Sequence, residues 1–319
     1  MDRRTSQMLT TLVLVAAAVV VVFILTREGG PLAPPRVVPP ASVPAPVPDA
    51  RTAPADASVH LALGNPSGAT DDPANADNYL MRKPYYAVSY NNAKGTPNWV
   101  CWRLQRSDLG DAPREPFFPD PDLPNSFNHV TPRDYSGTGF DRGHMCPHSD
   151  RGSTKEASTA TFAMTNMVPQ APNLNQKAWA DFEDYCRTVV RKREPVLYIV
   201  AGPVGKGGEG TNGPADAIAR GKVTVPARCW KMVVVVDGGT GGPEDAAKVG
   251  PHTRVIGVVM PNDQSVGHGW AKYRTSVKDI EALTGYTFFD RVPADVAEQL
   301  KAKADTEHVP PSRPRRSGD

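Results

Sequence analysis

The sequence lacks an excess of charge of either sign, because its 36 lysines and arginines nearly balance its 34 aspartates and glutamates. A formal net charge of +2 does not mark a nucleic-acid binder, so any phosphate-binding surface must be a local patch. Cysteine is also scarce, with only Cys101, Cys146, Cys186 and Cys229. No two of them form a C-x-x-C pair, which argues against a zinc site or a thioredoxin motif. No internal repeat is present.

The cysteines leave two interpretations open. One or two disulfides are expected if the domain lies outside the cytoplasm, and four cysteines allow three full pairings. Four buried thiols are an equally good interpretation.

A long uncharged segment lies near the N-terminus, at residues 8–26. About 19 such residues at ~1.5 Å each span the bilayer core. A cleaved signal peptide would have a shorter apolar region followed by small residues, whereas Arg27 and Glu28 follow this one. We therefore predict an uncleaved transmembrane anchor over residues 1–28. Arg3 and Arg4 favour a cytoplasmic N-terminus and an extracytoplasmic domain, periplasmic or at the cell surface.

The 33 prolines are unevenly spread and mark the domain boundaries. Residues 29–58 are rich in Pro and Ala and predict a disordered, extended linker. Residues 303–319 predict a disordered basic tail. Between them, residues 59–302 form one globular domain.

The hydrophobic pattern of this domain predicts a mixed fold. Short runs rich in apolar and β-branched residues predict strands at 85–90, 99–104, 196–200, 232–236 and 255–260. Helices are predicted at 175–191 and 277–284, with Gly285 as the C-cap of the second. The prediction is a central antiparallel sheet with flanking helices.

The densest polar cluster spans residues 139–148 and contains Asp141, Arg142 and His144, with Gly143 expected to allow a sharp turn. A histidine beside a carboxylate and a guanidinium suits proton transfer near a phosphate. Taken alone, a histidine in a glycine-rich loop is more often a surface or capping residue. Cys146 follows closely, and a buried thiol supporting this loop is favoured over an oxidised or paired one.

A second polar cluster spans residues 165–183, where Asn175, Trp179 and Glu183 are spaced four apart. Ordinary helix capping by Asn173 or Asn175 is the simpler interpretation. In an α-helix, Asn175 and Glu183 would be ~12 Å apart along the axis, too far for both to bind one ion directly. One amide-oxygen ligand, with Glu183 holding waters around the ion, fits better and suits Mg²⁺.

Together the two clusters closely resemble the DNA/RNA non-specific endonucleases, a family that includes endonuclease G and secreted bacterial nucleases. The motif Asp141-Arg-Gly-His144, followed by Asn175 within Asn-Leu-Asn-Gln-x-x-Trp and then Glu183, carries the resemblance. It extends over most of residues 60–300. The resemblance implies an α+β domain with the ββα-metal nuclease fold.

The resemblance also implies roles for individual residues. His144 would be the general base that activates water, and Asn175 the single direct protein ligand of Mg²⁺, for which Mn²⁺ could substitute. Glu183 would orient water around the metal. Arg114 resembles a phosphate-contacting arginine, and Arg142 belongs to the catalytic motif itself.

Three further residues match family positions without a catalytic role. Asp141 would be structural, and Asn166 and Gln170 would belong to the scaffold of the active site.

The predicted function is metal-dependent hydrolysis of phosphodiester bonds in DNA and RNA with little sequence preference. Weak preference follows because contacts to phosphate carry no base information. The alternative is a membrane-tethered nucleic-acid-binding receptor with vestigial catalysis, and a third is a metal-free structural domain. Expected partners are DNA, RNA and, through the N-terminal helix, the membrane. The oligomeric state is open, with a homodimer as one candidate.

Overall fold

The computed structural model of the chain describes residues 59–309. The predicted membrane anchor and the Pro/Ala-rich linker lie outside these residues. Within residues 59–309, the helices are all too short or too polar to cross a membrane.

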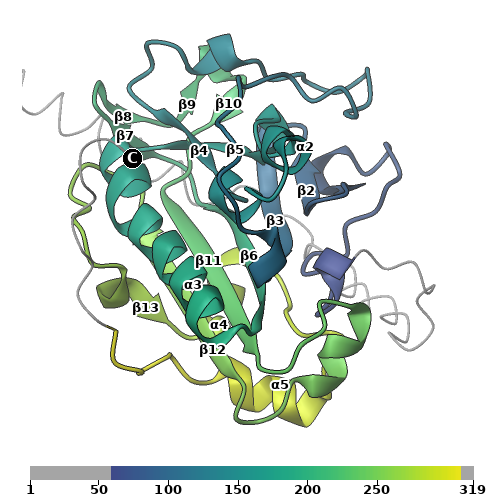
Figure 1. Cartoon of the computed structure of the whole chain (residues 1–319). Helices are drawn as coiled ribbons and strands as arrows, with labels where there is room; N and C mark the ends of the chain where they lie inside the picture. The colour runs from purple at the N-terminus through teal and green to yellow at the C-terminus, as the bar shows by residue number, and fades with distance from the viewer. Residues whose placement is uncertain (1–58, 310–319) are drawn as a thin grey trace, which may run out of the picture. The chain divides into compact units, whose positions relative to one another are not determined.

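The centre of the domain is one seven-stranded sheet in the order β1-β2-β3-β6-β11-β12-β13 (Figure 1). Every neighbouring pair is antiparallel. The strands are β1 (Tyr79–Arg82), β2 (Ala87–Asn91), β3 (Thr96–Leu104), β6 (Val196–Val204), β11 (Arg228–Val236), β12 (Arg254–Pro261) and β13 (Arg274–Thr275). The predicted central antiparallel sheet is therefore confirmed.

Alternating side chains of β11 enter two separate cores. Val233 and Val235 pack on the face that carries helix α3 (Ala180–Arg193), while Met232 and Val234 pack on the opposite face. Because both faces of the sheet are covered, its central strands are apolar almost throughout rather than alternating with polar residues.

Helix α3 runs across one face of the sheet over β6 and β11 (Figure 1). Two C-terminal helices, α4 (Val277–Thr284) and α5 (Ala294–Lys301), pack on each other, and α4 contacts β12. A further short helix of the described residues is α2 (Lys155–Ala160). Helix α4 has the predicted bounds, and Gly285 ends it in the left-handed conformation at φ 74°.

Shorter elements surround this framework. Three two-stranded ribbons lie outside the main sheet: β4 (Asp141–His144) with β5 (Met167–Gln170), β7 (Gly208–Gly210) with β8 (Gly213–Ala215), and β9 (Ala217–Ile218) with β10 (Val223–Thr224). Single 3₁₀ turns cover Val59–Leu61, Ala76–Asn78, Arg106–Asp108, Pro132–Tyr135, His148–Asp150, Met164–Asn166, Ala219–Gly221, Pro243–Lys248 and Trp270–Tyr273.

The structured part of the chain continues past residue 302, the end of the domain that the sequence predicts. The side chain of Asp305 is only 3% exposed and forms ion pairs with Arg254 at 2.8 Å and Arg274 at 3.3 Å. These paired charges attach the segment after α5 to strands β12 and β13.

Candidate active site

The polar motif at residues 141–144 forms strand β4, which pairs antiparallel with β5 so that His144 lies opposite Met167. Because side chains alternate along a strand, Arg142 and His144 lie on one side of the ribbon, and Asp141 and Gly143 lie on the other. The motif therefore presents two chemically different faces.

Gly143 does not make the sharp turn that the sequence suggested, because it lies inside β4 and lacks a positive φ. A Cβ atom there would lie 2.1 Å from Oε1 of Gln170, whose side chain is fully buried. The glycine is needed for close approach of the Gln170 amide. The buried Gln170 side chain thus packs directly against strand β4.

His144 lies among aromatic rings. Its ring centroid is 4.9 Å from that of Phe162, 5.4 Å from Phe117 and 6.4 Å from His148. Burial lowers the pKa of His144 to about 3, and the positive charges of Arg114 and His148 contribute. Its Nε2 atom is buried and has no hydrogen-bond partner among the described residues. The imidazole is therefore neutral near pH 7 and has a ring nitrogen available for a proton.

Two arginines lie against the same pair of aromatic rings. The guanidinium of Arg114 is 5.4 Å from the centroid of Phe162, and that of Arg142 is 5.3 Å from that of Phe117. Arg142 also donates from Nη2 to the carbonyl of Pro132 at 2.6 Å. The structure thus brings Arg114, Arg142 and His144 together around Phe117 and Phe162.

Asn175 lies in a π-helical segment, Leu174–Trp179, that leads into α3. The ~12 Å separation between Asn175 and Glu183 along the axis assumed an α-helix. A π-helix closes its hydrogen bonds from i to i+5, so Asn175 does not project in the direction that α-helical spacing from Glu183 would give it. The predicted helix over 175–191 is confirmed, but its first part is a π-helix rather than the α-helix that the spacing argument assumed. Such π-helical turns are frequent at functional sites.

The amide of Asn175 does not cap the helix. Its Nδ2 donates to Oδ2 of Asp141 at 2.8 Å, and Gln176 donates to the same oxygen at 2.9 Å. Asn173 makes no side-chain cap either, so the capping interpretation is wrong. Because Asp141 fixes the amide nitrogen, the amide oxygen of Asn175 is the atom left for a cation. Asp141 thereby links the π-helix to β4.

Glu183 lies on α3 with its side chain 12% exposed, and its Oε1 accepts a hydrogen bond from Nζ of Lys231 at 3.0 Å. Burial raises the pKa of Glu183, and the charges of Lys231 and Arg187 offset this in part. Sequence reasoning missed Lys231. The signal was one lysine within the apolar run from Cys229 to Val236, since lysines are almost never fully buried unless paired.

All four cysteines are buried and have free thiols, as in the buried-thiol interpretation and not as in the disulfide interpretation. Asn166 holds the backbone next to the site, because its Oδ1 accepts from the amide of Cys146 and its Nδ2 donates to the carbonyl of Cys146, both at 2.9 Å. Burial raises the pKa of the Cys146 thiol far above its ordinary value. Cys146 therefore supports the loop as an inert thiol.

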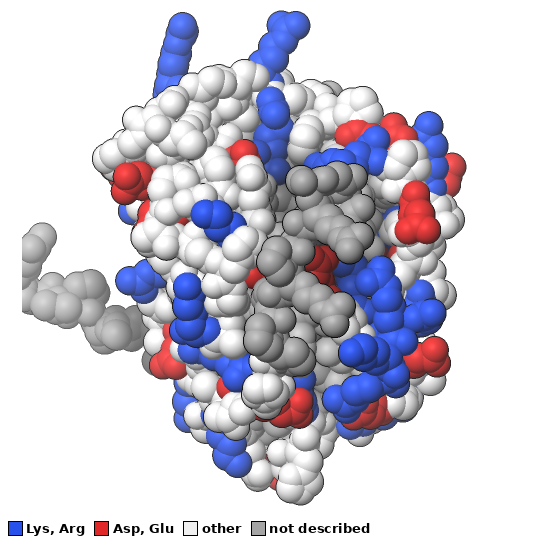
Figure 2. Space-filling model, turned by 60° about the vertical axis from the view of Figure 1, so that its left-hand side comes forward, with Lys and Arg blue, Asp and Glu red and all other residues white. Residues whose placement is uncertain are grey.

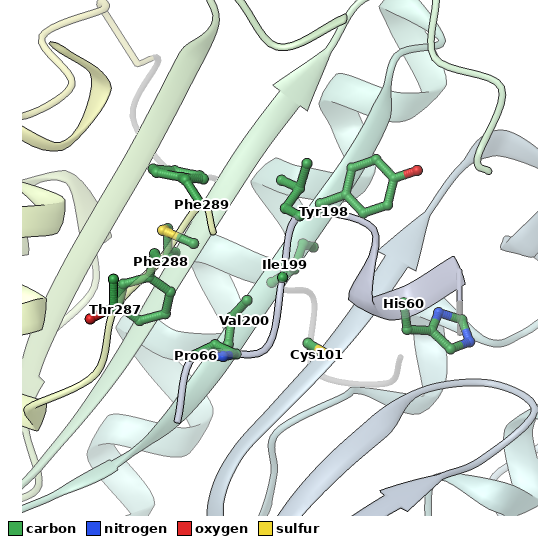
Figure 3. A pocket seen from close by; sticks show the side chains of 12 residues that line it. His60, Pro66, Cys101, Tyr198, Ile199, Val200, Thr287, Phe288 and Phe289 are labelled. Carbon is green, nitrogen blue, oxygen red and sulfur yellow. The ribbon is translucent and has the colours of Figure 1, made fainter. Parts of the chain in front are cut away.

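A small, mostly apolar pocket lies on the sheet face opposite α3, lined by His60, Cys101 and Phe288 among others (Figure 3). Its volume of about 20 Å³ is room for about one water. The predicted site residues do not line it. The chemistry therefore lies away from this cavity.

The surface charge is mixed. Figure 2 shows Lys and Arg side chains among Asp and Glu, with one denser group of Lys and Arg toward the right of the view. This agrees with a near-zero net charge.

Comparison with known proteins agrees with the motifs. A sequence model of the DNA/RNA non-specific endonucleases matches residues 63–295. The chain is 48% identical over 249 residues to a nuclease of Nostoc sp., covering 78% of this chain and 86% of that protein. It is 28% identical over 232 residues to mitochondrial endonuclease G of Homo sapiens, covering 70% and 73%.

The fold is similar to a chain in the solved EndoG/EndoGI complex, with a TM-score of 0.59 and 22% identity. That similarity covers 75% of this chain and 95% of the other. With a family match over most of its length, the chain belongs to the DNA/RNA non-specific endonuclease family.

Proposed function

We propose that the protein is a metal-dependent endonuclease that hydrolyses phosphodiester bonds of DNA and RNA with little sequence preference. The observation that carries the proposal is the setting of His144. Its ring is neutral and has a buried, unpartnered Nε2, and it lies with Arg114 and Arg142 around one aromatic pair.

His144 is proposed as the general base that takes the proton from an attacking water. A pKa of about 3 keeps the ring neutral at physiological pH but makes it a weak base. An anionic phosphate beside the ring would raise this pKa, because a nearby negative charge favours the protonated form. The base therefore gains strength when substrate is bound.

The donor set fits a hard divalent cation such as Mg²⁺ or Mn²⁺. Asn175 offers an amide oxygen that Asp141 orients, and Glu183 offers a carboxylate oxygen for waters around the ion. Among residues 59–309, no cluster of three or more His, Cys, Asp or Glu side chains could hold a metal. When bound, the cation would stabilise negative charge that develops on the phosphate.

Arg114 and Arg142 are proposed to contact the phosphate. Guanidinium groups match phosphate oxygens in geometry and remain charged at every physiological pH. Neither phosphate nor arginine carries base information in such a contact, so low sequence preference follows.

The test is cleavage of plasmid DNA and of RNA by the full chain with Mg²⁺, with EDTA, and as the His144→Ala variant. We expect cleavage of both substrates that EDTA and the substitution each suppress. Binding of nucleic acid without cleavage would instead favour the receptor with vestigial catalysis. A protein that neither binds nor cleaves nucleic acid would favour the structural domain.

We also propose that residues 1–28 anchor the enzyme in a membrane with the catalytic domain outside the cytoplasm. The support is the uncharged run at residues 8–26, preceded by Arg3 and Arg4. Protease added to spheroplasts should digest the domain. A domain that is cut only after lysis would contradict this topology.

A further inference from the structure

Strand β11 carries one fully buried charge. Lys231 lies between Trp230 and Met232 in a strand that is apolar from there to Val236, and its side chain is 1% exposed. It points to the α3 side of the sheet, because it shares the parity of Val233, which belongs to that core. A buried ammonium needs a compensating partner.

The surroundings of Lys231 supply that partner and fix its position. Its Nζ lies 3.0 Å from Oε1 of Glu183, 4.1 Å from the ring centroid of Trp179 and 5.6 Å from that of Trp102. Cation–π contacts with two tryptophans leave the ammonium little freedom to move. Trp179 is the last residue of the π-helix that carries Asn175, so Lys231 contacts both Glu183 and the helical segment of Asn175.

A second buried pair completes the charge balance. Arg187 donates to Asp150 at 2.8 Å, and both side chains are at most 4% exposed. The four groups Lys231, Glu183, Arg187 and Asp150 together carry no net formal charge. Loss of Lys231 alone would leave the buried carboxylate of Glu183 on α3 without its partner charge.

Stability alone gives no reason to keep the Lys231–Glu183 ion pair as a whole, although removing only one of its members is costly. Replacing a buried ion pair by apolar residues of similar volume is often neutral or stabilising. The neighbours of Lys231 on β11 are themselves apolar, so methionine would suit the strand.

We propose that Lys231 is a positioning residue for the nuclease reaction, holding the Glu183 carboxylate by Oε1 so that Oε2 is left for the waters around the catalytic cation. This inference rests on the proposed role of Glu183. Lys231 itself contacts neither the cation nor the phosphate.

The experiment compares Lys231→Met with Lys301→Met in the full chain. Lys301 is a matched control, because its side chain is 7% exposed and its Nζ lies 2.9 Å from Glu281, in the contact between α4 and α5. Calorimetry with Mn²⁺ gives metal affinity, and cleavage of a DNA oligonucleotide gives kcat and KM. Lys231→Met should lower Mn²⁺ affinity and kcat by about 10–100-fold, the scale for losing a group that orients a metal ligand, with KM unchanged. Lys301→Met should change neither.

A double variant tests whether Lys231 acts through Glu183. The variant Lys231→Met/Glu183→Gln should have the same kcat and Mn²⁺ affinity as Glu183→Gln alone, because the group that Lys231 holds is already gone. It contains no uncompensated carboxylate, so it serves even if Lys231→Met fails to fold. A further loss in the double variant, or a folded Lys231→Met with normal Mn²⁺ affinity, would overturn the inference.

Two measurements separate this inference from the proposed function. Wild-type cleavage that persists in EDTA would refute the metal-dependent reaction itself, whatever Lys231 does. A Glu183→Gln variant with normal kcat would refute the role of Glu183. If both support the reaction while Lys231→Met equals wild type, only the role of Lys231 fails.

Discussion

Replacing Gly143 by alanine should damage the enzyme through one specific overlap. The added Cβ would meet Oε1, Cδ and Cγ of Gln170 at 2.1, 2.4 and 2.5 Å. Real Cβ atoms do not approach so closely, so the Gln170 side chain or strand β4 must shift. Gln170 is fully buried and lies opposite Asp141 in the β4–β5 ribbon, so it has little room to yield.

The size of the effect follows from overpacking. Inserting a methyl group into a well-packed site typically costs about 1–3 kcal/mol of unfolding free energy. For a domain of this size each kcal/mol lowers Tm by about 2–4 °C, so a fall of roughly 2–12 °C is expected. The neighbouring residue is His144, the proposed general base, and a displacement of about 1 Å at such a group can cost about 10²-fold in rate. Activity should therefore fall further than stability alone explains.

The assay is thermal unfolding by calorimetry together with single-turnover cleavage below the lowered Tm. Gly250→Ala is the matched control, because a Cβ there meets nothing within 4 Å and the residue has no positive φ. It should be neutral or slightly stabilising. The double variant Gly143→Ala/Gln170→Ala should lose less unfolding free energy than the two single variants lose in sum, because the overlap is gone. A Gly143→Ala protein that behaves like Gly250→Ala would refute the reasoning.

Three further predictions concern the site and its charge. His144→Ala should keep its Mn²⁺ affinity in calorimetry while cleavage falls by about 10²-fold or more, whereas Asn175→Ala should lose Mn²⁺ affinity; the opposite pattern would reverse the two roles. Arg114→Ala should slow cleavage of all oligonucleotide sequences alike, since a phosphate contact reads no base, and a sequence-dependent change would contradict the assignment. Burial lowers the pKa of both His60 and His144 to about 3. A solvated histidine titrates near about 6.5, so the unfolded chain binds more protons between these values. The free energy of unfolding should then fall as the pH drops through this window, by up to about 1.4 kcal/mol per pH unit for each ring, and pH-independent urea unfolding would count against neutral buried rings.

The sequence predicted those elements whose signal is local. The apolar runs at 196–200, 232–236 and 255–260 lie within β6, β11 and β12. They were found because a strand covered on both faces must be apolar at nearly every position. Helix α4 was predicted with its bounds because Gly285 marks its end.

Strand β4 and the π-helix could not be found in this way. Residues Asp141–His144 show no apolar alternation, and their partner strand β5 contains Pro169. Pairing with β5 and packing of Gln170 against Gly143 make them a strand, and both depend on residues far along the chain. The π-helical turn shares its sequence signal with an α-helix, so the spacing argument assumed the commoner geometry.

The candidate residues of the site were proposed from motifs, but their structural partners could not be. Nothing local links His144 to Phe117 and Phe162, or Glu183 to Lys231, since each contact joins separate segments. The motif predicts which groups act, and tertiary packing decides whether they are neutral, charged or held in place.

The pairing of charges explains how a chain with a net charge of +2 can attract a phosphate. The negative charge of the Glu183 carboxylate is paired with the positive charge of Lys231. This buried pair therefore contributes little to the electrostatic potential at the surface. Arg142 is different, because the hydrogen bonds of its guanidinium go to the neutral carbonyl of Pro132 and the hydroxyl of Ser136. Its charge is therefore not cancelled by these partners, and it lies on the same side of β4 as His144. Positive potential can thus be local to His144, the proposed general base, while the chain as a whole stays nearly neutral.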